Sequence, residues 1–361
     1  MSKLFGGVYN GRKCLVTGDS GFKGSWLVTW LTQMGAEVKG YALAPNTPTN
    51  HKTLLQTKYK SIEGNILDYN VLQKVFKEFQ PEIVFHLAAQ SLVKYSYKNP
   101  IETYQTNVIG TLNVFEVSRQ TESVKAIINV TSDKCYENRE WVWGYRENDP
   151  MGGYDPYSSS KGCSELLTQS YRKSFFDENT RQILLASARA GNVIGGGDWS
   201  QDRLIPDLIK AAAIEKETEI RNPLATRPWQ HVLDPLSGYL LLGWKLLEGE
   251  KEFADGWNFG PKLSSNLSVQ EIANEANLFW PKIKYFVSTT EDHHHEANLL
   301  MLDCSKSNKL LKWTPVWEKS QTIQKTVEWY KEFYEKGVIK TEEDITQYVR
   351  DAVTKKKIWT L

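Results

Sequence analysis

Short apolar runs alternate with longer amphipathic stretches along the first half of the chain. Six runs have the composition of buried strands, at 13–17, 37–43, 59–65, 82–89, 124–132 and 182–190. Strands that alternate with helices are joined by right-handed crossovers into a parallel sheet. The pattern therefore predicts an α/β fold of the Rossmann type, with a doubly wound parallel sheet.

The stretches between these runs have helical spacing. In the first of them, residues 22–34, Trp26, Trp30 and Leu31 fall on one stripe. The next stretch ends before Pro81, which disfavours helix and precedes a strand. The spacing predicts further helices at 70–79, 99–119, 156–176, 203–215, 233–248, 268–279 and 320–336.

The second half of the chain has a different composition. After about residue 189 it contains segments rich in Gly, Pro and Trp, namely GNVIGGGDW, RNPLATRPWQ and GWNFGPKLSS. A length of 361 residues suits two domains. Without a linker between the halves, we expect two interleaved domains. Residues 1–188 plus about 230–256 form the Rossmann domain, and about 189–229 plus 257–361 form a smaller C-terminal substrate domain.

Charge and cysteine content exclude several classes of protein. The 44 Lys and Arg residues balance 43 Asp and Glu residues, so no overall field attracts nucleic acid or a membrane surface. The four cysteines are far apart and form no C-x-x-C pair, which argues against a disulfide framework or a zinc site. The longest apolar patch, 239–247, contains Lys245 and is too short to span a bilayer. We expect a cytoplasmic protein with a small-molecule partner.

A glycine-rich segment joins the first predicted strand to the first predicted helix. Gly18, Gly21 and Gly24 are spaced G-x-x-G-x-x-G. Glycines at this position allow backbone N–H groups and a helix N-terminus to approach a pyrophosphate. The alternative is a turn without a ligand. The end of the second strand, 39–43, has neither an acid for a ribose 2′-hydroxyl nor an arginine for a 2′-phosphate, and we expect the cofactor to be NAD.

A second constellation is Tyr157 and Lys161, which a helix places on one face. A lysine beside a phenol favours the phenolate, and the positive nicotinamide adds to this effect. Both bring a group with a free pKa near 10 toward use as a base near neutrality. Such pairs are also common on solvated helix faces, so their catalytic meaning depends on the glycine loop and on Ser132.

These motifs together resemble the extended short-chain dehydrogenase/reductase superfamily. The resemblance is carried by the glycine loop, HLAAQ at 86–90, Asn107 within TNVIGT, Ser132, Tyr157 and Lys161. It implies a Ser, Tyr and Lys triad and a homodimer or homotetramer paired through helices 99–119 and 156–176. It also implies that NAD is bound by Gly18, Ser20, Gly21, Phe22, Lys23, Gly24, Asn65, Ile66, Leu87, Ala88, Ala89, Asn107, Tyr157 and Lys161.

The triplet Ser132, Asp133 and Lys134 indicates the branch of that superfamily. Sugar nucleotide 4,6-dehydratases typically have Thr or Ser followed by Asp and Glu, whereas epimerases lack this acid and base. Lys134 in place of the Glu, with the later GGGDW and RPWQHV, resembles the branch that acts on CDP-glucose. The resemblance implies oxidation at C4, loss of water across C5 and C6, and return of hydride to C6 in a deoxysugar pathway such as that of the lipopolysaccharide O-antigen.

In that chemistry Asp133 is the expected acid and Lys134 the expected base. Asp133 must then be protonated and Lys134 neutral, which desolvation favours and their mutual attraction opposes. The alternative is that Lys134 forms a salt bridge with Glu137 or Glu147.

The resemblance also implies a set of substrate contacts. They are Gln90, Ser132, Asn192, Arg203, Arg227, Asn258 and His295. Arg227 has an alternative role as a partner of Asp234. Histidines at 293–295 suggest a metal, but adjacent residues of an extended chain point to opposite sides, so we expect no metal site.

Three other functions remain open. The chain could dehydrate another sugar nucleotide, such as GDP-mannose, dTDP-glucose or UDP-glucose, or it could be a 4-epimerase. From a different class, it could bind NAD as a regulator without turnover. Such a regulator would have no need of Ser132, Tyr157 and Lys161 together.

Overall fold

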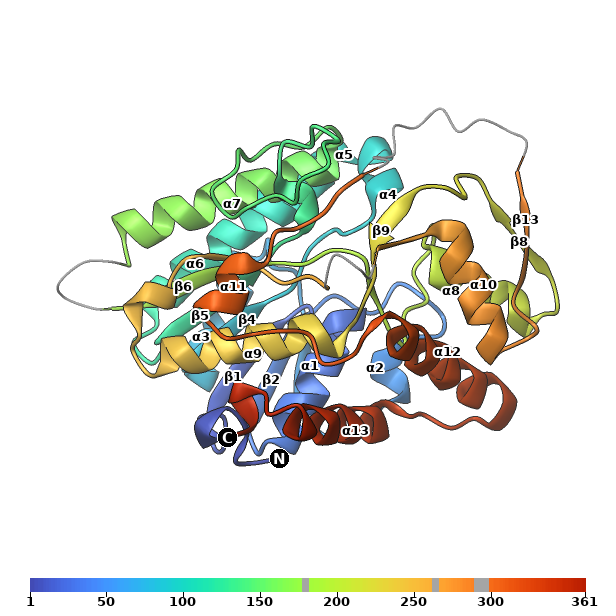
Figure 1. Cartoon of the computed structure of the whole chain (residues 1–361). Coiled ribbons are helices and arrows are strands. Elements are labelled where there is room, and N and C mark those ends of the chain that lie inside the picture. Colours follow the sequence, from blue (N-terminus) through green and yellow to red (C-terminus); the bar gives the residue numbers. More distant parts are fainter. Residues whose placement is uncertain (177–181, 262–265, 289–298) are drawn as a thin grey trace.

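The computed structural model describes residues 1–176, 182–261, 266–288 and 299–361. Its centre is a seven-stranded sheet in the order β11-β6-β5-β4-β1-β2-β3, in which every neighbouring pair is parallel (Figure 1). All six predicted strands are present and the Rossmann-type fold is confirmed. The strands are β1 Lys13–Thr17, β2 Glu37–Ala42, β3 Lys60–Glu63, β4 Ile83–His86, β5 Ala126–Val130, β6 Leu184–Arg189 and β11 Gly256–Asn258.

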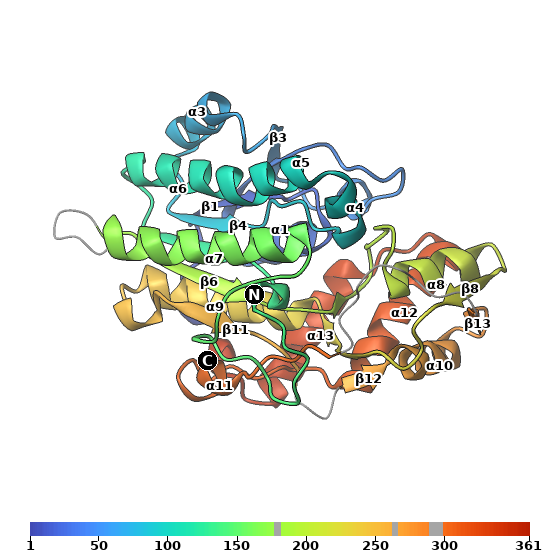
Figure 2. The same ribbon diagram turned by 90° about the horizontal axis from the view of Figure 1, so that it is seen from above.

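Helices cover both faces of this sheet, which is why its strands β4, β5 and β6 are buried throughout and largely apolar. One face packs on α1 (Phe22–Gln33) and α9 (Leu233–Leu247). The other packs on α3 (Tyr69–Phe79), α6 (Gly110–Gln120) and α7 (Pro156–Ser174), of which α6 and α7 lie side by side in Figure 2. Because the helices cover the two faces of the sheet, they leave uncovered the edge at which the carboxyl ends of the strands lie.

A smaller group of elements lies beside the sheet (Figure 1). It contains the predicted helices α8 (Leu204–Ala213), α10 (Val269–Phe279) and α12 (Lys319–Lys336). Three two-stranded sheets accompany them. These pair β7 (Val193–Ile194) with β10 (Gln230–His231), β9 (Thr226–Pro228) with β12 (Asn266–Ser268), and β8 (Glu217–Ile220) with β13 (Lys284–Val287).

Several elements differ from the prediction. The expected helix 99–119 is divided into α5 (Pro100–Tyr104), a π-helical turn at Gln105–Ile109, and α6. The short helices α2 (His51–Leu54), α4 (Val93–Lys98) and α11 (Ser305–Lys309) give too little periodicity to predict, and α13 (Thr341–Thr354), which contacts α1, was also missed. Short 3₁₀ turns lie at Leu4–Gly7, Asp133–Cys135, Lys251–Phe253 and Ile358–Thr360.

None of the helices in the described part of the chain is long and apolar enough to cross a membrane.

Candidate active site

The glycine loop lies at the carboxyl end of β1 and is shaped by close backbone contacts. Gly18 has φ +75°, and a Cβ there would lie 2.6 Å from the backbone nitrogen of Ala88. A Cβ on Gly24 would lie 2.1 Å from the carbonyl oxygen of Gly18. The N-cap of α1 is Gly21, which has no side chain to bind the first N–H groups of the helix. These N–H groups and the positive end of the helix suit a pyrophosphate.

The other expected cofactor residues lie on neighbouring loops of the same sheet edge. Leu87 and Ala88 directly follow β4 and are bonded to Thr17 through their backbone nitrogens, at 3.1 Å to its carbonyl oxygen and 3.3 Å to its hydroxyl. Asn65 and Ile66 follow β3, where the carbonyl of Asn65 accepts from the Tyr41 hydroxyl at 2.9 Å. Ser20 and Ala89 are half-buried on these loops, and Phe22 and Lys23 are half-buried in the first turn of α1.

Asp19, within the glycine loop, was not singled out from the sequence. Its carboxylate is fully buried, accepts hydrogen bonds from Tyr59 at 2.8 Å and Ser61 at 2.7 Å, and pairs with Lys52 at 3.0 Å. A Cβ on Gly40 would lie 2.3 Å from this carboxylate. Asp19 therefore anchors the loop to β2 and β3, and Gly40 provides the space for it.

Asn107 lies in the π-helical turn between α5 and α6 and is 1% exposed. Its side-chain nitrogen donates to the carbonyl of Gln90 at 2.9 Å and to Ser160 at 2.8 Å, and its oxygen accepts from the Gln90 nitrogen at 2.9 Å. Protein groups thus meet both ends of this amide, and a contact of Asn107 with the cofactor stays a prediction. Asn107 instead joins the loop after β4 to α7.

The side-chain amide of Gln90 is likewise bonded within the protein. Its side chain donates to the carbonyl of Leu92 at 3.2 Å and to Thr103 at 2.9 Å, and it accepts from the Leu92 nitrogen at 2.5 Å. The amide shapes its own loop, and its contact with the substrate stays a prediction.

Ser132, Asp133 and Tyr157 meet at the carboxyl end of β5, where each side chain is buried. Ser132 Oγ donates to Asp133 Oδ1 at 2.9 Å and accepts from the backbone nitrogen of Lys134 at 3.2 Å. Burial raises the pKa of the Tyr157 phenol to about 12, while its hydrogen bond with Ser132 lowers the pKa. Burial therefore outweighs this hydrogen bond, and the net shift of the phenol pKa is upward.

Lys161 lies one helical turn after Tyr157 and is also buried, with Nζ 3.4 Å from the carbonyl of Val130. Burial lowers its pKa to about 8, and the nearby charge of Glu165 opposes this shift. Glu165 itself forms a buried ion pair with Arg189 at 2.8 Å. Helix α7 thus brings the Tyr157 phenol and the Lys161 ammonium group to the edge of the sheet, and the Glu165 carboxylate lies one helical turn after Lys161.

Gly191 explains how the Asp133 carboxyl fits into the site. A Cβ at this position would lie 1.7 Å from Asp133 Oδ2 and 2.1 Å from its Cγ. The carboxyl therefore lies directly against the Gly191 backbone, where a larger residue would displace it. The sequence shows the glycine in ARAGNVIG but gives no sign of this contact.

Lys134 is half-buried. Within the described ranges it forms no ion pair with Asp133 or with either expected alternative partner. Glu137 pairs with Arg139 at 3.2 Å, and Glu147 accepts from the backbone nitrogen of Asn258 at 3.0 Å. The salt-bridge alternative for Lys134 is therefore not observed in this part of the chain.

Two further cations lie near the triad. Arg203 is bound to Asp198 at 2.8 Å, and its charge acts on the Tyr157 phenol. Burial lowers the pKa of Lys23 to about 8, and the charges of Arg203 and Asp133 act on it in opposite directions. Arg203 and Lys23 therefore add positive charge to the region between the glycine loop and Asp133.

The remaining expected substrate residues have different surroundings. Asn192 is half-buried and has φ +47°. Arg227 lies on β9. Its expected alternative partner, Asp234, instead accepts hydrogen bonds from the Val316 backbone nitrogen and the Tyr348 hydroxyl. Asn258 is 0% exposed, and its contact with the substrate stays a prediction. Protein groups use its entire amide: it accepts from Tyr136 and donates to the carbonyls of Tyr145 and Asp303.

His293, His294 and His295 lie outside the described residues. The described residues contain no cluster able to hold a metal.

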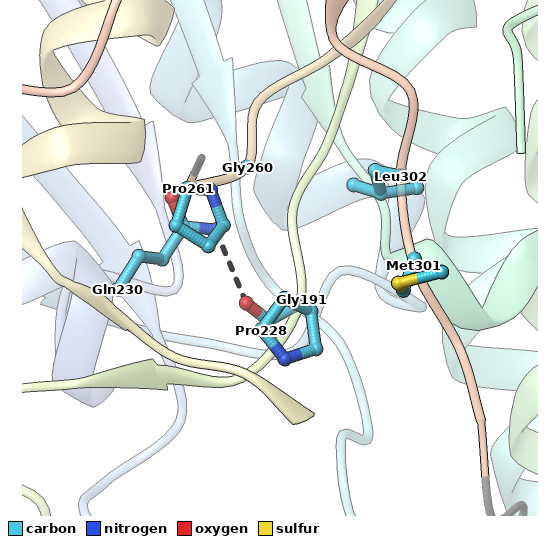
Figure 3. Close-up of a pocket in the computed structure, with 7 residues that line it drawn as sticks. All are labelled: Gly191, Pro228, Gln230, Gly260, Pro261, Met301 and Leu302. Carbon is cyan, nitrogen blue, oxygen red and sulfur yellow. Dashed lines mark hydrogen bonds between the residues drawn. The ribbon is translucent and has the colours of Figure 1, made fainter. Parts of the chain in front are cut away.

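A cavity opens next to Gly191, between β10 and the segments that follow β11 and precede α11 (Figure 3). Its walls are formed by Gly191, Pro228, Gln230, Gly260, Pro261, Met301 and Leu302. Because Gly191 also touches Asp133, this cavity adjoins the buried carboxyl group.

Comparison with known proteins agrees with this geometry. The family model described as GDP-mannose 4,6 dehydratase matches residues 15–326. The CDP-glucose 4,6-dehydratase of Salmonella typhimurium is 49% identical, over 94% of this chain and 97% of that protein. Among solved structures, a dTDP-glucose 4,6-dehydratase from Bacillus anthracis in complex with NAD has a TM-score of 0.73 at 23% identity, covering 90% of this chain and 98% of that one. The epimerase Mth375 from Methanothermobacter thermautotrophicus has a TM-score of 0.80 at 25% identity, covering 91% and 94%.

The parallel sheet, the glycine loop and the buried Ser, Tyr and Lys constellation are thus accompanied by similarity along nearly the whole sequence. The chain belongs to the GDP-mannose 4,6 dehydratase family.

Proposed function

We propose that this protein converts CDP-glucose to CDP-4-dehydro-6-deoxyglucose by an NAD-dependent loss of water. The observation that carries the proposal is the meeting of Ser132, Asp133 and Tyr157 next to the glycine loop, with Lys161 one turn away. The 49% identity to a CDP-glucose 4,6-dehydratase supports the choice of substrate.

The residues present fit a dinucleotide cofactor. Gly18 and Gly24 allow a tight turn in which backbone atoms pack too closely for a Cβ, and the first N–H groups of α1 have no side-chain cap and suit a pyrophosphate. Bound at this loop, NAD would supply a hydride acceptor for C4 of the sugar and a hydride donor for C6. Lys161 and the backbone around Ala88 lie at the same edge of the sheet and would hold the nicotinamide end.

Tyr157 takes the proton of the C4 hydroxyl. Burial raises the pKa of the Tyr157 phenol even with the Ser132 hydrogen bond and the Arg203 charge in place, so Tyr157 holds its own proton, and the positive charge of a bound nicotinamide would favour the phenolate. Lys161, with a pKa of about 8, exchanges protons readily near neutrality and is suited to support this step. Burial of all three side chains excludes water from the transfer.

Elimination then requires an acid and a base on the sugar side. The 4-ketone acidifies the C5 hydrogen, Lys134 removes it, and Asp133 donates a proton to the departing C6 hydroxyl. Asp133 is held against Gly191 and bonded to Ser132, so its carboxyl position is fixed before substrate arrives. Lys134 has no ion-pair partner within the described ranges, so its amine is available to the substrate.

We propose that Arg203, Asn192 and Arg227 meet the diphosphate, because a phosphate group requires cations and N–H donors. Arg203 is already positioned by Asp198. The interleaved domain boundaries given above also remain our proposal. Free thiols at all four cysteines agree with a reducing cytoplasm.

We further propose that the protein is a homodimer, with a homotetramer as the alternative. Large apolar side chains on α5, α7 and the π-helical turn are exposed, namely Ile101 at 73%, Ile109 at 47% and Leu166 at 55%. These elements lie on one side of the molecule (Figure 2). A second copy that covered them would bury this apolar surface.

The test is incubation of the protein and NAD with CDP-, dTDP-, GDP- and UDP-linked glucose or mannose. A 4-keto-6-deoxy product from CDP-glucose, formed faster than from the other sugar nucleotides, is expected. Faster conversion of another sugar nucleotide would replace CDP-glucose as the substrate, and absence of product from all of them would refute the dehydratase assignment.

A further inference from the structure

The first turn of α7 has one backbone N–H group that the helix's own cap does not bind. Asp155 caps the helix, and its side chain accepts from the Ser158 nitrogen at 2.9 Å and from the Ser158 hydroxyl at 2.6 Å. The carbonyl of Asp155 accepts from the Ser159 nitrogen. Pro156, the first residue of the helix, has no N–H group. The N–H of Tyr157 is therefore left to a partner outside the helix.

That partner is Ser96, which precedes Tyr157 by 61 residues. Ser96 lies on α4, beside the start of α7, and is 0% exposed (Figure 2). Its hydroxyl donates to the carbonyl of Val93 at 2.7 Å and accepts from the Tyr157 nitrogen at 3.1 Å. The bond to Val93 fixes the direction of the hydroxyl hydrogen, so a lone pair of the oxygen faces Tyr157.

The carbonyl of Tyr157 is bound as well. Ser160 Oγ donates to this carbonyl at 2.7 Å and accepts from the side-chain nitrogen of Asn107 at 2.8 Å. Buried hydroxyl groups thus bind both main-chain polar groups of Tyr157. Because the phenol ring is rigid and joined to the backbone by a short stem, the position of this backbone largely decides where the phenol oxygen lies.

Helix α4 is fixed by contacts on both sides of Ser96 in sequence. Lys94 pairs with Asp202 at 3.3 Å, and Arg203 donates to Ser91 at 3.4 Å. Asp202 and Arg203 directly precede α8, in the smaller group of elements beside the sheet. A helix of six residues has little stability of its own, so these contacts help to hold Ser96 in place.

We propose that Ser96 is a positioning residue, which holds the backbone of Tyr157 and thereby aligns its phenol with the C4 hydroxyl of the substrate. The inference rests on the proposed function, because it takes Tyr157 to remove the proton of that hydroxyl. Helix α7 does not need this bond in order to form, since it has 19 residues and Asp155 as its cap. Loss of the bond should therefore shift Tyr157 within a folded protein.

The test compares wild type with Ser96→Ala in steady-state conversion of CDP-glucose and in the rate of nicotinamide reduction during a single turnover. We expect kcat and the single-turnover rate to fall about tenfold, the factor that corresponds to one lost hydrogen bond. KM should stay within about twofold of wild type, because Tyr157 acts in the chemical step. Urea unfolding shows that the variant is folded.

Ser118→Ala is the matched control. Ser118 lies on α6 and is also 0% exposed, and its hydroxyl donates to the carbonyl of Val114 in its own helix at 2.7 Å, as that of Ser96 donates to Val93. The substitution removes the same group and the same kind of bond within a helix. It should leave both rates within about threefold of wild type.

Ser96→Cys provides a second variant if Ser96→Ala does not fold, because its thiol fills the same space and is only a weak acceptor. It should also lower kcat and leave KM unchanged. Wild-type kcat in a folded variant, a change in KM alone, or an equal fall in Ser118→Ala would overturn the inference while leaving the dehydratase function intact. Failure of wild type to convert CDP-glucose would overturn both.

Discussion

Replacing Gly191 with alanine should displace the carboxyl group of Asp133 and slow dehydration without any change to Asp133 itself. The added Cβ would lie 1.7 Å from Asp133 Oδ2, whereas real contacts of this kind do not fall below 3.0 Å, so the two atoms must separate by about 1.3 Å. The Asp133 side chain cannot easily turn away to relieve this clash, because it is short, buried and bonded to Ser132. Gly191 does not have a positive φ, so alanine suits the backbone itself.

A displacement of about 1 Å at a catalytic group costs roughly a hundredfold in rate. We therefore expect kcat for dehydration of CDP-glucose to fall about a hundredfold in Gly191→Ala, with the thermal unfolding transition retained. Gly260→Ala, in the same cavity, brings its Cβ only to 3.2 Å from Cys304 Sγ, and it should stay within about threefold of wild type.

A double variant links the effect to the Asp133 carboxyl. In Asp133→Ala the carboxyl is absent, so adding Gly191→Ala should slow the enzyme no further. A folded Gly191→Ala protein with wild-type kcat, or a double variant much slower than Asp133→Ala alone, would refute the reasoning.

The remaining predictions concern the base, acid stability and assembly. Solvent deuterium should enter C5 of the product in wild type and not in Lys134→Ala, and normal C5 exchange in that variant would exclude Lys134 as the base. Burial lowers the pKa of His51, His86 and His231 to about 3, so below pH 6.5 the unfolded chain binds protons that the folded chain does not. Each imidazole should therefore lower the free energy of unfolding by about 2 kcal/mol at pH 5. Burial raises the pKa of Asp234 to about 6 and that of Asp344 to about 7, which acts in the opposite direction and offsets part of this fall. Urea unfolding at pH 7 and pH 5 measures this fall, which should be smaller in His51→Asn, and equal stability of wild type at both pH values would contradict it. Leu166→Glu should shift the protein to a monomer in sedimentation, while Leu278→Glu, at a position 76% exposed on α10, should not, and the same mass for both variants would argue against α7 as the interface.

Local sequence patterns determined most of the central sheet. Six strands and the helices between them follow from the alternation of apolar runs with amphipathic stretches, because each strand is buried on both faces and each helix on one. The seventh strand, Gly256–Asn258, is too short for its period to be visible. The four-residue spacing of Tyr157 and Lys161 likewise needs only one helix to bring both side chains to the same side.

Tertiary structure decided which polar side chains remain available to a ligand. Family pattern gave Gln90, Asn107 and Asn258 as contacts, but each amide is used by protein groups that lie far away in sequence or in a turn of irregular geometry. Burial sets the pKa of Tyr157 and Lys161, and burial depends on everything packed around α7.

The sequence by itself thus determined the fold, the glycine loop and the identity of the reacting groups, since these depend on local period and residue type. The contact between Gly191 and Asp133, and the hydrogen bond from Tyr157 to Ser96, join positions far apart along the chain. Only the packing of β4, β5 and β6 brings them together, because a side chain's neighbours across a sheet edge depend on strand order and loop path, neither of which is encoded in adjacent residues.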